Sequence, residues 1–157
     1  MLSKIFPKQY DNDYRGHKLA LLLLIIITAF NLIMFYQTVF NTYYAATSAD
    51  GIPLDSYSPE ASQRVMYIFA LLGNVHFVFI TLAVLALARY RTMVPLVFLC
   101  EIIEFLGRKA ISNHYYDTPW VQLPDNLASG IVHSLFYLML VGFGLSVWHR
   151  PQDKTGQ

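Results

Sequence analysis

Four long apolar stretches alternate with more polar segments along the chain. They cover residues 19–40, 65–88, 93–111 and 127–148. A helix that crosses a membrane needs about 20 mostly apolar residues, and each stretch is close to that length. The pattern therefore predicts an all-α protein with a single integral membrane domain over residues 1–157. Its four transmembrane helices form an antiparallel bundle, and the tails over residues 1–18 and 149–157 are expected to be flexible.

The residues between the stretches support these boundaries. Ser58 is a suitable N-cap, Pro59 fits the first helical position, and Glu60 lies in the first turn, where the helix dipole favours a negative charge. The connection over residues 89–92 is so short that the second and third helices must form a tight antiparallel hairpin. The first apolar stretch is longer than that of a secretory signal, so we expect this helix to be retained.

Positive charges beside the predicted helices indicate an orientation. Cytoplasmic flanks of transmembrane helices are enriched in lysine and arginine. We therefore expect both termini in the cytoplasm, in a multi-pass protein of a cell inner membrane. The expected cytoplasmic side has eight such residues and the other side three. The eight are Lys4, Lys8, Arg15, Lys18, Arg89, Arg91, Arg150 and Lys154, and the three are Arg64, Arg108 and Lys109.

Composition agrees with a membrane location. Hydrophobic residues make up 55% of the chain and charged residues 13%, whereas a soluble domain carries about 25% charged residues. A net charge of +1 gives no indication of nucleic acid binding. The lipid bilayer is therefore the expected environment. Cys100, the single cysteine, lies in an apolar run and is interpreted as a small core residue.

The third stretch carries charges that a membrane helix normally avoids. It reads "LCEIIEFLGRKAIS" and contains Glu101, Glu104 and Arg108. Their spacing of three and four residues places them on one helix face. Glu104 precedes Arg108 by four residues, which is the favourable order for an ion pair. A charge in hydrocarbon is costly, so Glu101 is expected to face the interior of the bundle.

Polar residues on the other three helices also lie in the middle or outer half of the bundle. Glu101 is ~15 Å, His76 ~16 Å and Asn31 ~14 Å from the outer ends of their predicted helices, from the rise per residue. We expect His76, Asn74 and Glu101 to meet, with Glu104, Arg108 and His133 in the outer part of the same network. The candidate polar site is Asn31, Asn74, His76, Glu101, Glu104, Arg108 and His133.

Small residues follow one face of the fourth helix. Gly130, Ser134, Gly142 and Ser146 lie on a ridge of i, i+4 positions that only Leu138 interrupts. Small residues at this spacing let helix backbones approach closely in membranes. The ridge is therefore interpreted as a packing face within the bundle or as a contact with a membrane-protein partner or a second copy.

Four functions remain open from the residues alone. The first is a structural or accessory subunit, in which the polar network fixes the helix arrangement. The second is a lipid-binding or small-molecule-binding protein, or an enzyme that uses Glu101 and His76 for proton transfer. The third is a component of a transporter or channel. The fourth is a haem protein with His76 and His133 as axial ligands, although their estimated depths differ by ~7 Å. No catalytic residue or metal site is assigned.

Three sequence segments resemble known bacterial membrane proteins. The segment "FLGRKAIS" at the end of the third helix, together with four spans and a long outer loop, resembles the small four-helix proteins of the DoxX-like type. The segments "SADGIPLDSYSPEASQ" and "RYRTMVPLVFLCEIIEFLGRK" are similar to proteobacterial membrane proteins of this length. The resemblance implies a four-helix bundle in a bacterial inner membrane and implies no particular activity.

Overall fold

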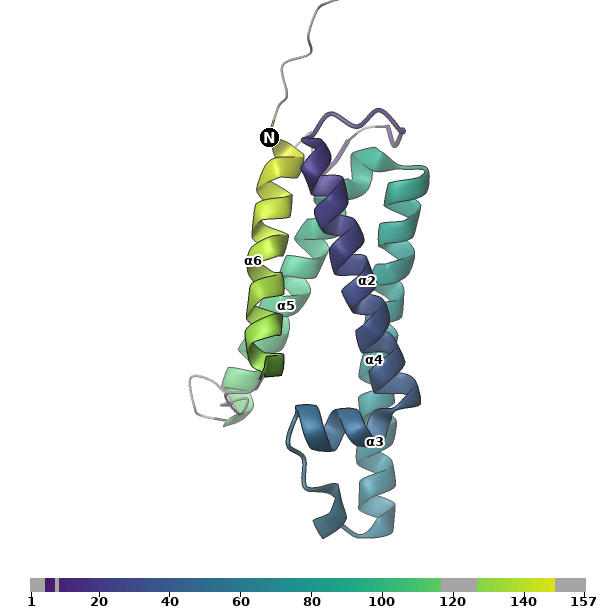
Figure 1. Cartoon of the computed structure of the whole chain (residues 1–157), viewed down its shortest axis with the longest axis vertical. Coiled ribbons are helices and arrows are strands. Elements are labelled where there is room, and N and C mark those ends of the chain that lie inside the picture. The colour runs from purple at the N-terminus through teal and green to yellow at the C-terminus, as the bar shows by residue number, and fades with distance from the viewer. Residues whose placement is uncertain (1–4, 8, 117–126, 149–157) are drawn as a thin grey trace, which may run out of the picture.

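Four long helices form the protein, as the computed structural model shows for residues 5–7, 9–116 and 127–148 (Figure 1). These helices are α2 (Lys18–Phe40), α4 (Pro59–Ala88), α5 (Val94–Tyr116) and α6 (Leu127–Val147). Within the described residues there is no strand, so the prediction of an all-helical chain is confirmed. The short elements are α3 (Thr42–Tyr44), the π-helix η1 (Ala45–Ala49) and the 3-10 helices η2 (Leu54–Ser56) and η3 (Arg91–Met93).

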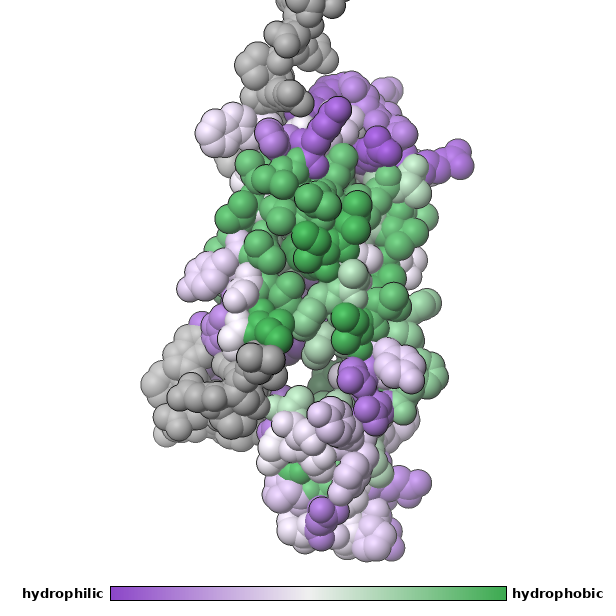
Figure 2. Space-filling model, viewed as in Figure 1, coloured by the Kyte–Doolittle hydropathy of each residue, from purple (hydrophilic) through white to green (hydrophobic). Residues whose placement is uncertain are grey.

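Three of the helices are long and apolar enough to cross a membrane. They are Lys18–Phe40, Pro59–Ala88 and Gly130–Val147, with mean hydropathies of 2.6, 2.3 and 1.8. Figure 2 shows the resulting apolar belt around the middle of the molecule. The chain is therefore a membrane protein. Helix α5 is as long as α2, with 23 residues, but it carries the charged residues Glu101, Glu104 and Arg108.

Helix α4 begins earlier than the hydropathy pattern predicts. It starts at Pro59 rather than near residue 65, because Ser58 caps it by accepting a hydrogen bond from the backbone N–H of Ala61 at 3.3 Å. Its 30 residues span ~45 Å, which exceeds the ~30 Å hydrocarbon thickness of a bilayer. The added turns are polar in sequence, so hydropathy alone could not detect them.

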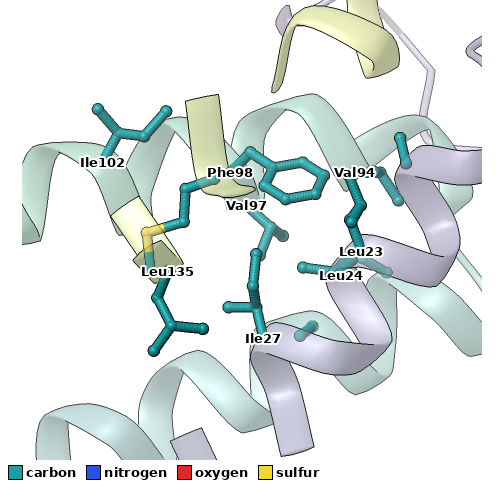
Figure 3. Close-up of a cluster of buried hydrophobic side chains, with 12 residues drawn as sticks. Leu23, Leu24, Ile27, Val94, Val97, Phe98, Ile102 and Leu135 are labelled. Carbon is teal, nitrogen blue, oxygen red and sulfur yellow. The ribbon is translucent and has the colours of Figure 1, made fainter. Parts of the chain in front are cut away.

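A dry core fills the end of the bundle where α4 turns into α5, which we call the short-turn end. Its fully buried side chains include Leu24, Ile27, Val94, Val97 and Phe98 (Figure 3). At Gly142 of α6, a Cβ would collide with the Phe98 ring, so this ring lies directly against the α6 backbone. Helices α2, α5 and α6 are thereby packed together at this end.

The opposite end, which holds residues 41–58, is called the long-loop end. Helices α2 and α4 remain in close contact there, because the space of a Cβ on Gly73 is taken by the side chains of Thr38 and Val39. Elements α3 and η1 lie across the end of this pair (Figure 1). By contrast, no described side chain of α5 beyond Ile102, and none of α6 before Leu135, is buried. The shared core therefore ends partway along the bundle.

The N-terminal segment is attached to the short-turn end. The backbone N–H of Asp11 donates to Thr92 Oγ1 at 3.1 Å, and the backbone N–H of Thr92 donates to the Asp11 carbonyl at 3.3 Å. The backbone N–H of His17 donates to the Leu145 carbonyl at 3.0 Å. A flexible tail was expected over residues 1–18, but its described part from residue 11 onward is fixed to both the turn and α6.

Candidate functional site

The site lies where the dry core ends. Asn31 of α2 and Glu101 of α5 are only 5% and 3% exposed, and His76 of α4 is half-buried. Ile27 and Ile102 of the core lie next to them in the sequence or one helical turn away. The polar layer is therefore the first layer beyond the apolar packing, at about the middle of the helices.

Asn31 links three helices through one amide group. Its Nδ2 donates to Glu101 Oε1 at 2.8 Å, and its Oδ1 lies 2.9 Å from His76 Nδ1. Since an amide oxygen can only accept, Nδ1 of His76 must carry the hydrogen in this arrangement. The connected set His76–Asn31–Glu101 is called the polar triad below. Each member comes from a different helix, so the triad fixes the relative positions of α2, α4 and α5.

Two polar atoms of the triad have no hydrogen-bond partner. They are His76 Nε2 and Glu101 Oε2, for which the described residues offer neither a donor nor an acceptor. Within those residues, no side-chain nitrogen or oxygen that is fully buried lacks a partner. It follows that Nε2 and Oε2 both retain contact with accessible space. The triad is thus closed at its centre and open at both ends.

A charged group lies closer to the long-loop end. Arg108 binds Glu104 on the same helix at 2.9 Å, as the spacing of four residues predicted. Desolvation raises the pKa of the Asp50 carboxyl above its usual value, although the residue is exposed, and the positive charge of Arg108 partly offsets this effect. The charge of Arg108 is therefore felt at Asp50, in the connection after η1.

Two aromatic pairs lie beside the triad. Phe35 follows Asn31 by four residues and contacts Phe77, with ring centroids 5.4 Å apart. Phe105 follows Glu101 by four residues and stacks on Phe136 at 4.4 Å. Residues four apart share a helix face. Each helix pair, α2 with α4 and α5 with α6, thus carries an aromatic pair just outside the polar layer.

The helix pairs separate toward the long-loop end. Figure 2 shows an opening through the molecule between the lobe of α3 and η1 and the rest of the bundle. The absence of buried side chains on the outer parts of α5 and α6 agrees with this opening. Among the described residues, the helix pairs are thus less tightly packed at this end than at the short-turn end.

The structure unites some of the predicted site residues and separates others. His76 and Glu101 join through Asn31, a predicted site residue for which no partner was predicted. Asn74 does not replace it, because it is exposed and lies two residues, ~200° around α4, from His76. His133 is half-buried on α6, and no hydrogen bond joins it to the triad, Glu104 or Arg108.

Sequence reasoning missed Asp50 altogether. Asp50 lies in the connection after η1, and nothing in its sequence neighbours indicates a buried partner. Only the fold of residues 41–50 brings it within reach of the charge of Arg108. A loop carboxylate of this kind could have been found only by a search for a second negative charge, besides Glu104, that acts with the positive charge of Arg108.

Comparison with known proteins adds no relative. No family model, no curated protein and no solved structure matches the chain.

Proposed function

We propose that the protein is a small multi-pass protein of a bacterial inner membrane that binds a small amphipathic molecule at the polar triad. The observation that carries this proposal is the pair of unpartnered atoms, His76 Nε2 and Glu101 Oε2, at mid-membrane depth. A ligand site in a protein is typically an apolar space with a few convergent polar groups. The triad, with apolar helices around it and an opening beyond it, fits this description.

We further propose that α5 is the fourth membrane crossing. Its length equals that of α2. Its charged side chains have partners, which lowers the free-energy cost of placing them in a membrane. Glu101 is buried and bonded to Asn31, and Glu104 is paired with Arg108 on the same helix. Intramembrane ionisable residues are expected to face the bundle interior and to pair in this way.

Both termini are proposed to be cytoplasmic, because Lys18, Arg89 and Arg91 all lie at the short-turn end. Reporter fusions after Gly51 and at Gln157 test this orientation. We expect cytoplasmic reporter activity at Gln157 and periplasmic activity at Gly51. Periplasmic activity at Gln157 would overturn the orientation. Equal compartments for the two sites would overturn α5 as a crossing, because only α4 and α6 would then cross between them.

Native mass spectrometry of the protein, purified in a mild detergent, tests the binding function. The wild-type spectrum should contain a second series with the mass of a bound molecule. Glu101→Gln should lose that series while keeping its helical circular dichroism. Glu60→Gln is the matched control, because Glu60 is exposed at the start of α4. A wild-type spectrum without bound mass, after extraction from native membranes, contradicts the proposal.

A structural or accessory role is the second candidate, and the state of the α6 ridge favours it. Gly142 and Ser146 are buried, whereas Ser134 is exposed and a Cβ on Gly130 would meet no atom within 4 Å. The outer half of the ridge thus has room for a helix of a partner or of a second copy. Gly130→Leu should then dissociate an oligomer measured by light scattering. Gly144→Leu is the control, since Gly144 is equally open.

A further inference from the structure

The hydrogen-bond polarity of the triad restricts what can bind to it. Asn31 presents its amide nitrogen to Glu101 and therefore its oxygen to His76. His76 must donate from Nδ1, and a neutral imidazole that carries its hydrogen on Nδ1 has a lone pair on Nε2. The unpartnered Nε2 is thus an acceptor, and a ligand that meets it must supply a hydrogen-bond donor.

The second open atom restricts the ligand further. Glu101 Oε2 accepts when the carboxyl is ionised and can donate when it is protonated. A hydroxyl group both donates and accepts, so it satisfies this atom in either state. The imidazole and the carboxyl bond to the same amide of Asn31, so both open atoms belong to one connected group.

Depth and neighbours indicate the rest of the ligand. The triad lies near the middle of the helices, and a charged headgroup such as a phosphate is strongly disfavoured at that depth. The polar end of the ligand is therefore uncharged. The aromatic pairs Phe35–Phe77 and Phe105–Phe136 lie beside the triad. Aromatic rings pack favourably on other aromatic rings in offset-stacked or edge-to-face geometry.

We propose that the triad binds a lipid-soluble phenol, an aromatic ring with a free hydroxyl and an apolar tail, whose hydroxyl donates to His76 Nε2 and also contacts Glu101 Oε2. This inference rests on the binding function proposed above and adds the chemical class of the ligand. The tail of the phenol lies toward the long-loop end, where the helix pairs separate (Figure 2). Asn31 is a positioning residue. It sets the tautomer of His76, and both of its amide atoms are already bonded to His76 and Glu101, so it does not bind the ligand itself.

The first test concerns the histidine alone. Protein labelled with ¹⁵N-histidine in detergent micelles should give, for His76, a protonated Nδ1 and an unprotonated Nε2, and a His76→Gln spectrum assigns the signals. Addition of 4-octylphenol should shift the Nε2 resonance. Its methyl ether, 4-octylanisole, has the same ring and tail but no donor and should leave the resonance in place. A hydrogen on Nε2 in the free protein would overturn the inference.

The second test measures affinity. In equilibrium dialysis with wild-type protein, 4-octylphenol should bind about tenfold more tightly than 4-octylanisole, since the ether lacks one hydrogen bond. His76→Phe should remove this preference, and Asn74→Leu should retain it. This comparison changes the ligand and does not depend on a variant that folds poorly.

The outcomes separate the inference from the function on which it rests. Equal binding of the phenol and its ether would overturn the phenol, as would a co-purified molecule without a hydroxyl group in native mass spectrometry. In the latter case the binding function stands. If neither probe binds and no molecule co-purifies, the binding function itself fails, and the inference fails with it.

Discussion

The two ends of the bundle solve the problem of helix association in different ways. At the short-turn end, side chains such as Phe98 fill the space between helices so tightly that Gly142 cannot carry a Cβ without displacing the ring. At the long-loop end, α5 and α6 bury none of their described side chains. The triad lies at the boundary between the two. The packed end gives the bundle its stability, and the open end leaves room for a second molecule.

This difference teaches why a polar group can persist at the boundary. Apolar packing between helices gains little from burial when lipid is the alternative, so hydrogen bonds and close contacts between helices become important. Asn31 makes two hydrogen bonds to two different helices at the point where side-chain packing stops. The triad thus replaces packing as the link between α2, α4 and α5.

The largest effect is expected from removal of that link. Asn31→Leu leaves a buried carboxyl at Glu101 and an imidazole at His76 without their common partner. We expect the free energy of unfolding to fall by ~3 kcal/mol, measured by titration with a denaturing detergent. The double variant Asn31→Leu/Glu101→Leu should recover much of this loss. Asn74→Leu is the control, since Asn74 is exposed, and it should be close to neutral. An equal loss in both asparagine variants would contradict the role of the triad.

The next effect tests the packed end. Gly142→Ala must displace the Phe98 ring from the backbone of α6. Forcing an extra methyl group into such a core costs ~1–3 kcal/mol, and the same detergent titration measures it. Gly130→Ala adds the same methyl at a position with no atom within 4 Å of the new Cβ. It should be neutral or stabilising, because alanine favours a helix over glycine. Similar losses at both positions would mean that the two ends do not differ in packing.

A smaller effect is expected at the attachment of the N-terminal segment. Thr92→Val removes the Oγ1 that accepts from the backbone N–H of Asp11 and donates to the Asp11 carbonyl, both at 3.1 Å. The loss of these two hydrogen bonds costs ~1–2 kcal/mol, and hydrogen exchange at the Asp11 amide should become faster. Thr81→Val makes the same substitution at an exposed threonine whose hydroxyl bonds only within α4, so it should leave that exchange rate unchanged. An unchanged exchange rate in Thr92→Val would mean that this contact does not attach the N-terminal segment to the short-turn end.

Much of this comparison could be predicted from the sequence. Apolar length predicted four helices, and the described helices cover all four stretches. The pairing of Glu104 with Arg108 is confirmed because both lie on one helix, where spacing determines distance. The approach of His76 to Glu101 depended on matching depths, which is weaker information. Depth does not give the direction of a side chain, which is why Asn74 was expected in the network and Asn31 proved to be its centre.

Other features could not be predicted for physical reasons. The hydrogen bonds between Asp11 and Thr92 join residues 81 positions apart, and no periodicity reports such a contact. The separation of the helix pairs depends on how α3 and η1 fold across one pair only (Figure 1). Residues 41–58 are mostly polar and aromatic, and this composition is compatible with many loop conformations. It therefore does not predict the observed one.

The smallest effect concerns the charges at the open end. Desolvation raises the pKa of Asp50, and Arg108 opposes the rise. The native carboxyl thus holds its proton more tightly than the unfolded one, so stability falls as pH rises from the usual aspartate value through the raised one.

Arg108→Gln removes the opposing charge and should raise the pKa of Asp50 further. This pKa is measured by ¹³C NMR of the carboxyl groups. Arg64→Gln is the control, because Arg64 does not contribute to the pKa of Asp50. An unchanged pKa in Arg108→Gln would mean that the charge of Arg108 does not reach Asp50 in solution. The lobe of α3 and η1 would then stand farther from α5, and the opening at this end would be wider than the structure indicates.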